Sequence, residues 1–142
     1  MRKSRSGTTL AELLIALVII SIVGAFGMAT SQRTAARRAV LSAGREAEAA
    51  FATARRNAIA TSRPTAIRLN AATHELIVYA GSDTIQRLQP EARHGVTFTS
   101  TRDSMAYDAN GLGVGAANLT LRLIREPAAE TLVVSRLGRV RR

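Results

Sequence analysis

The first sixty residues divide into an apolar stretch and a stretch with helical periodicity. Residues 10–29 are almost entirely apolar or small, and Glu12 and Ser21 are the polar exceptions. About 20 such residues are enough to span a membrane as a helix. From residue 33 to residue 60 there is no proline, and apolar side chains recur at spacings of three and four. That stripe consists of Val40, Ala43, Ala47, Phe51, Ala54 and Ala58.

These patterns predict one long N-terminal helix, with a transmembrane first half and an amphipathic second half. The helix should end before Pro64, because the residue preceding a proline disfavours helical geometry. Beyond Pro64 the pattern changes to short β-rich runs separated by turn residues. The expected strands are 66–69, 75–80, 84–88, 95–100, 119–124 and 131–135. The predicted fold class is therefore α+β, with the helix packed on an antiparallel β-sheet domain.

The charge balance restricts the kinds of partner. The chain of 142 residues has a formal net charge of +10, and Lys3 is its only lysine. Such a balance favours anionic partners, which are nucleic acid, anionic lipid or acidic protein surfaces. An arginine-rich proteome would explain arginine over lysine, but it would not explain the excess of base over acid. The absence of cysteine excludes disulfides and cysteine-ligated metals.

Glu12 is the one charge inside the apolar stretch. A carboxylate at the centre of a membrane helix costs on the order of 2.5–3.5 kcal/mol, so an intramembrane acid indicates a function and needs a partner. We find no partner for Glu12 within the segment, which places the partner on another molecule. Arg2, Lys3 and Arg5 precede the segment and predict a cytoplasmic N-terminus.

Three interpretations of the N-terminus remain open at this point. The first is a signal peptide cleaved near residues 27–29, although Glu12 fits its apolar region poorly. The second is a plain single-span anchor. The third is a short basic leader that ends in glycine and is removed, while the apolar helix is retained.

Residues 5–19, RSGTTLAELLIALVI, resemble the class III signal of type IV pilins and type II secretion pseudopilins. The resemblance implies that a prepilin peptidase cleaves after Gly7 and that Thr8, in place of the usual phenylalanine, becomes the N-methylated first residue. Glu12 is then the fifth mature residue. It would pair with the freed amine of a neighbouring pilin, because a paired buried charge costs much less than a lone one.

The last third of the chain resembles the GspH/FimT group of minor pilins and pseudopilins. The segments that carry this resemblance are Asn110-Gly111-Leu112-Gly113, Leu119–Leu123, Leu132–Val134 and Gly138-Arg139-Val140-Arg141. It implies a pilin-like organisation in four parts. These are a leader (1–7), a transmembrane and filament-core helix (8–30), an amphipathic helix half (31–62) and a β-sheet domain with a basic tail (63–142).

The same resemblance implies a location. The protein would be a single-pass protein of the bacterial inner membrane with its C-terminal domain in the periplasm. It would later join a filament in the periplasm or at the cell surface.

The residues do not favour an enzyme, and we expect no cofactor and no metal site. His74 and His94 are the only histidines, and both are expected to be solvated. No serine or threonine has a convincing base and orienting acid. Asp103 and Asp108 lack the oxygen set that calcium requires.

The basic tail is the candidate binding site. Arg136, Arg139, Arg141 and Arg142 follow one another with no acid after Glu130. Arg139 and Arg141 have the spacing that places two strand residues on one face, and guanidinium groups bind phosphate oxygens bidentately. Members of the FimT group are associated with DNA capture through a Gly-Arg-x-Arg element, which residues 138–141 match. A solvated basic terminus or a docking surface for acidic neighbours is the alternative.

Three functions follow from the sequence. The first is a structural subunit of a type II secretion pseudopilus or a type IV pilus. The second is a subunit of such a filament that also captures DNA for uptake. The third is a plain membrane-anchored periplasmic β domain with no role in a filament.

Overall fold

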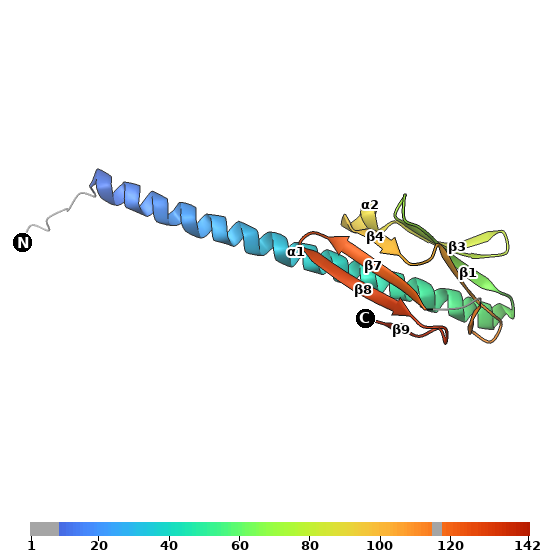
Figure 1. Cartoon of the computed structure of the whole chain (residues 1–142). Helices are drawn as coiled ribbons and strands as arrows, with labels where there is room; N and C mark the ends of the chain where they lie inside the picture. The colour runs from blue at the N-terminus through green and yellow to red at the C-terminus, as the bar shows by residue number, and fades with distance from the viewer. Residues whose placement is uncertain (1–8, 115–117) are drawn as a thin grey trace, which may run out of the picture. The chain divides into compact units, whose positions relative to one another are not determined.

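The computed structural model describes residues 9–114 and 118–142, without the side chains of 24–29. The chain forms two compact units, residues 1–34 and residues 35–142, and each is described by itself. One helix, α1 (Leu10–Thr61), passes through both units (Figure 1). It ends three residues before Pro64, in agreement with the conformational restriction that proline imposes.

The part of α1 in the first unit exposes its apolar residues. Ten large apolar side chains between Leu10 and Val23 are each more than half exposed. The sequence predicts a membrane span over residues 8–30. Among the described residues, no helix combines the length and the mean hydropathy that crossing a membrane requires.

The second unit contains two antiparallel sheets instead of the single sheet expected. The first has the strand order β3-β2-β1-β5-β6 and the second has the order β4-β7-β8-β9 (Figure 1). The strands of the first sheet are β1 (Thr65–Asn70), β2 (Glu75–Ala80), β3 (Asp83–Leu88), β5 (Ser104–Tyr107) and β6 (Gly113–Val114). Those of the second are β4 (Thr97–Ser100), β7 (Leu119–Arg125), β8 (Ala128–Val134) and β9 (Val140–Arg141). A short helix, α2 (Pro90–His94), lies between β3 and β4 in the sequence.

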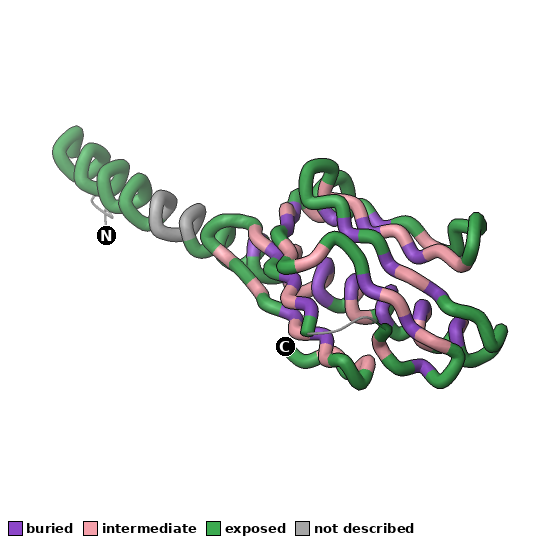
Figure 2. Tube along the Cα trace, turned by 45° about the vertical axis from the view of Figure 1, so that its right-hand side comes forward, coloured by how far each residue is buried: buried purple, intermediate pink, exposed green. Residues whose placement is uncertain are grey.

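The apolar stripe of α1 forms the centre of the core, as its periodicity predicts. All six residues of the stripe are buried, and Phe51 is fully so. Apolar side chains from both sheets belong to the same cluster, among them Leu76 of β2, Leu121 of β7 and Leu132 of β8. Figure 2 shows that the buried positions of α1 and of the strands lie within this unit. The α+β class, with the helix packed on antiparallel sheets, is confirmed.

Several short elements were not predicted. β5 is only four residues long and follows a polar loop, while β6 and β9 have two residues each, too few to show an alternation. The split into two sheets depends on pairing between distant segments. β1 pairs with β5 through Ile67 and Met105, and β7 pairs with β4 through Leu123 and Phe98.

Candidate functional site

The expected cleavage and methylation residues, Gly7 and Thr8, lie outside the described residues. Thr9 and Glu12, which follow them in the chain, are described and contact each other. Glu12 Oε2 accepts a hydrogen bond from the backbone N–H of Thr9 at 3.2 Å, and the backbone N–H of Glu12 donates to Thr9 Oγ1 at 3.3 Å. This reciprocal pair is a capping box at the start of α1.

The capping box gives Glu12 a hydrogen-bond partner that the sequence analysis did not name. That partner is Thr9, three residues earlier, and it supplies no opposite charge. The pattern Thr-x-x-Glu before an apolar run could have revealed it, because that spacing is the signature of a capping box. A carboxylate in the first turn also interacts favourably with the positive end of the helix dipole. Glu12 therefore has a local role in beginning α1.

The arginine tail belongs to a hairpin between β8 and β9. Ser135 and Arg139 close the turn: the Ser135 N–H donates to the Arg139 carbonyl at 2.8 Å, and the Arg139 N–H donates to Ser135 Oγ at 3.1 Å. Arg141 pairs with Val133 of β8. Arg139 precedes β9, so the strand expected from the spacing of Arg139 and Arg141 begins one residue later. Arg136, Arg139 and Arg141 are all exposed.

Arg142 differs from the other three arginines because it is held by two carboxylates. Its Nη2 lies 2.7 Å from Glu48 Oε2 on α1, and its Nε lies 3.5 Å from Glu130 Oε1 on β8. The sequence analysis predicted one binding role for all four tail arginines. All four are exposed, but among the described residues only Arg142 of the four is ion-paired, and it ties the end of the chain to the helix.

Gly138 fixes the position of the tail on the domain. It has a φ of +74°, which is left-handed and strained for other residues. A Cβ at this position would lie 3.0 Å from Tyr107 Cε1, 3.1 Å from the Gly111 carbonyl oxygen and 3.3 Å from Arg55 Cδ. The turns that contain Gly111 and Gly138 are therefore neighbours, and both lie close to Arg55. Gly138 also lies close to Tyr107.

Arg55 and Tyr107 were not singled out by the sequence. Tyr107 is fully buried, and this burial raises the pKa of its hydroxyl to about 12 against the opposing effect of the Arg55 charge. The Tyr107 hydroxyl and Arg55 Nε are buried without a hydrogen-bond partner among the described residues. A tyrosine at the end of a short strand and an arginine in a helix carry no sequence signal for such a meeting.

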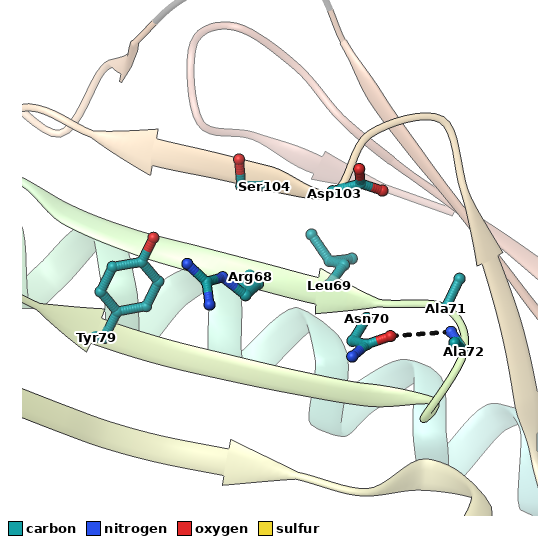
Figure 3. A pocket seen from close by; sticks show the side chains of 8 residues that line it. All are labelled: Arg68, Leu69, Asn70, Ala71, Ala72, Tyr79, Asp103 and Ser104. Atoms are coloured by element: carbon teal, nitrogen blue, oxygen red, sulfur yellow. Dashed lines mark hydrogen bonds between the residues drawn. The ribbon is translucent and has the colours of Figure 1, made fainter.

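An open pocket of about 420 Å³ lies at β1, with Asp103 and Ser104 at its other side (Figure 3). The Arg68 guanidinium carbon lies 5.7 Å from the centroid of the Tyr79 ring, within the range of a cation–π contact. Asn70 Oδ1 accepts a hydrogen bond from the Ala72 N–H at 3.0 Å, which orders the adjoining turn (Figure 3). No group of three or more potential metal ligands occurs in the part of the chain that the structure describes.

Both histidines are engaged in contacts, and neither is simply solvated as expected. His74 Nδ1 accepts the backbone N–H of Phe98 at 3.1 Å, which joins the β1–β2 turn to β4. His94 Nε2 lies 3.0 Å from Glu46 Oε1, which joins α2 to α1. Both contacts hold elements of the fold together.

The fold resembles that of two solved minor pilin structures. The crystal structures of the type IV minor pilin FimU of Pseudomonas aeruginosa, in space groups P21 and P65, align with TM-scores of 0.61 and 0.59. Identity is 18% in both, and the alignments cover 72% and 71% of this chain and 86% and 90% of those chains. No curated protein matches the sequence significantly.

The helix packed on antiparallel sheets thus defines a protein with the pilin fold. The model of the prokaryotic N-terminal methylation motif matches residues 2–28, which include Gly7, Thr8 and Glu12. The model of the type II transport protein GspH matches residues 43–138, and the chain belongs to that family. It is a minor pilin or pseudopilin of a type IV-like system, and its motif implies processing by a prepilin peptidase and assembly with other pilins.

We expect Gly138→Ala to destabilise the domain more than Gly81→Ala. Both glycines have positive φ, +74° and +60°, but a Cβ at Gly81 would meet nothing within 4 Å. Gly81→Ala thus measures the backbone strain alone, about 1–2 kcal/mol. Gly138→Ala adds close contacts with Tyr107 and with the Gly111 backbone. Urea unfolding of each full-length variant in non-ionic detergent, followed by circular dichroism, compares the two, and equal losses would contradict the proposed packing.

Proposed function

We propose that the chain is made as an inner-membrane precursor and assembles through α1 into a type IV pilus or a type II secretion pseudopilus. The observation that carries this proposal is the row of ten exposed large apolar side chains between Leu10 and Val23, which lies within the matched methylation motif at residues 2–28. Apolar surface of that extent is stabilised by burial against lipid or against similar helices. The C-terminal unit would be periplasmic before assembly.

The capping box adds a step to the assembly mechanism. Cleavage after Gly7 would create a cationic amine at Thr8, one residue before the N-cap. Glu12 Oε2 accepts the N–H of Thr9, and an ionised carboxylate has acceptor sites for a further donor. The carboxylate that begins α1 would thus receive the amine of a neighbouring subunit. A plain membrane-anchored β domain would need no such charge.

Three variants separate the charge of Glu12 from its role in the cap. Glu12→Gln keeps an acceptor at the N3 position of the capping box but removes the charge, and Glu12→Ala removes both. Thr9→Ala removes the cap and keeps the charge, at a cost of about 0.5–2 kcal/mol in helix stability. If the charge pairs with a neighbouring amine, both Glu12 variants lose most of their incorporation into filaments and Thr9→Ala retains it.

Incorporation is measured by immunoblotting filaments sheared from cells that express the partner pilins. Wild-type incorporation of Glu12→Gln would show that the carboxylate serves only the cap. Wild-type incorporation of Glu12→Ala as well would remove Glu12 from the assembly mechanism.

We further propose that the exposed tail arginines capture DNA. The hairpin turn presents Arg136 and Arg139 on the surface, with Arg141 following in β9. Guanidinium groups that contact phosphates give affinity that is independent of sequence and sensitive to salt. There is no aromatic residue between Arg136 and Arg142, so base stacking, and with it a preference for single strands, is not favoured.

The double variant Arg139→Ala/Arg141→Ala tests the tail. Removing two phosphate contacts should lower the slope of log affinity against log salt by about 1.8. Gel shifts with duplex DNA over a salt series measure this slope. Arg87→Ala/Arg93→Ala is the matched control, because it also removes two charges and both arginines are ion-paired. Arg87 of β3 lies 3.2 Å from Glu75 of β2, and Arg93 of α2 lies 3.2 Å from Glu46 of α1. An unchanged slope in the double variant would defeat the tail hypothesis.

A further inference from the structure

Most of the exposed large apolar side chains of the second unit gather at one place. Among its described residues, five such side chains are more than a third exposed, and Ile85 in β3 is one of them. The other four, here termed the apolar patch, lie on or beside the turns that contain Gly111 and Gly138. They are Ile59, Leu112, Val114 and Leu137, with exposed fractions of 49%, 43%, 53% and 60%. Single exposed apolar side chains are ordinary, but a group of this kind marks an interaction site.

Leu112 and Val114 share the outer face of one paired segment. They are two residues apart, and side chains alternate between the two faces of a strand. Gly113 between them pairs with the buried Tyr107, so Gly113 faces the core. The Asp108 N–H donates to the Leu112 carbonyl at 2.9 Å, which continues this pairing one residue before β6. Leu112 and Val114 therefore face away from the core, in agreement with their exposure.

Leu137 and Ile59 adjoin this segment. The Gly113 N–H donates to the Arg136 carbonyl at 3.0 Å, which places the β8–β9 turn, and Leu137 within it, beside the segment. A Cβ on Gly111 would lie 2.7 Å from Ile59 Cδ1, so the last turns of α1 reach the same place. The patch therefore combines side chains from α1, from the β5–β6 connection and from the β8–β9 turn.

The surroundings of the patch are positively charged. The segments 55–63, 108–114 and 135–142, which carry it, contain seven arginines and a single acid, Asp108. Asp108 Oδ1 already accepts two backbone N–H groups of its own turn, each at 2.9 Å. Of the seven arginines only Arg142 is ion-paired among the described residues. Arg136 and Arg139 are exposed on either side of Leu137, where they can receive the carboxylates of a partner.

The composition of the patch selects its partner. The core of a protein interface is apolar and its rim is polar, and opposite charges across the rim favour the correct partner. An apolar surface bordered by carboxylates meets both conditions. A second copy of this chain would bring the same arginines to the rim, where like charges repel. Duplex DNA would pair with the arginines but would leave the apolar side chains in water, unless a leucine entered the base stack.

We propose that the apolar patch binds the C-terminal domain of a different pilin, which presents apolar side chains bordered by carboxylates. This inference rests on the proposed assembly into a filament, and the methylation motif implies assembly with other pilins. It adds a contact between C-terminal domains to the contacts made by α1. The patch is preorganised, since backbone hydrogen bonds hold both turns in place before the partner arrives.

The first test is photo-cross-linking at Leu137. The photoreactive residue p-benzoylphenylalanine replaces Leu137 in the full chain, which is expressed in cells that contain the partner pilins. The matched control places it at Ile85, the exposed apolar residue outside the patch, whose strand β3 lies at the opposite edge of the first sheet from β6. Mass spectrometry identifies the adducts after irradiation. We expect adducts from position 137 with a different pilin, on a peptide that contains Asp or Glu, and we expect that peptide to be absent from the adducts of position 85.

The second test is incorporation into sheared filaments, measured by immunoblotting. The variant Leu112→Gln/Leu137→Gln removes apolar surface and keeps the arginines, and Ile85→Gln is its control. We expect at least about a tenfold loss for the double variant, because a few side chains at the core of an interface carry most of the binding energy. The control should be incorporated like the wild type. Arg136→Glu should lose incorporation as well, and replacing the partner's cross-linked carboxylate with arginine should restore it.

Two measurements on the purified full-length variants in non-ionic detergent keep the second test specific. Urea unfolding followed by circular dichroism should give wild-type midpoints, since the replaced side chains are largely exposed. Gel shifts with duplex DNA should give wild-type affinity for the double leucine variant, because leucine has no charge with which to contact phosphate. Cross-linking does not use these variants, so it decides the matter if one of them unfolds.

Each other result overturns the inference. Adducts of position 137 with a second copy of this chain would identify the wrong partner, and weaker DNA binding by the double leucine variant would show that the leucines enter the base stack. Wild-type incorporation of the double leucine variant would remove the patch from assembly and leave the filament proposal standing. Absence of the wild-type chain from sheared filaments would overturn the proposed function, and this inference with it.

Discussion

The burial of one face of α1 against two sheets is the constraint on which the rest of the structure depends. The alanines of the stripe and Phe51 are buried, and they belong to one apolar cluster with side chains of both sheets. Because this face is buried, the orientation of the helix about its axis is set, and each of its other sides has a specific set of neighbours. Glu46 on one flank binds α2, Glu48 on the other binds the C-terminal residue, and the face opposite the core is left to solvent.

The same helix therefore serves two different purposes along its length. Between Leu10 and Val23 its apolar side chains are exposed and call for contacts with lipid or other subunits. From Ala36 onward its apolar side is satisfied within the domain, and its charged flanks position the tail hairpin. The assembly proposal concerns the first part, and the DNA proposal concerns the second.

Much of this arrangement could be predicted because it rests on local periodicity. The stripe from Val40 to Ala58 and strands such as β2 follow from spacing alone. The two sheets, the pairing of Arg142 with Glu48 across 94 residues, and the niche of Arg55 and Tyr107 could not be predicted, because they depend on which distant segments become neighbours. The capping box of Thr9 and Glu12 is also local and follows from the Thr-x-x-Glu spacing, although the sequence analysis considered only the cost of the Glu12 charge in lipid.

We propose that this chain is a filament subunit whose helix is retained after its leader is removed. Mass spectrometry of the protein purified from membranes of cells that contain the prepilin peptidase tests this proposal. We expect a mature chain that begins at Thr8, with an added methyl group on its amine. A chain that begins near Thr30 would show that the apolar segment is an ordinary signal peptide, and the proposal would be wrong.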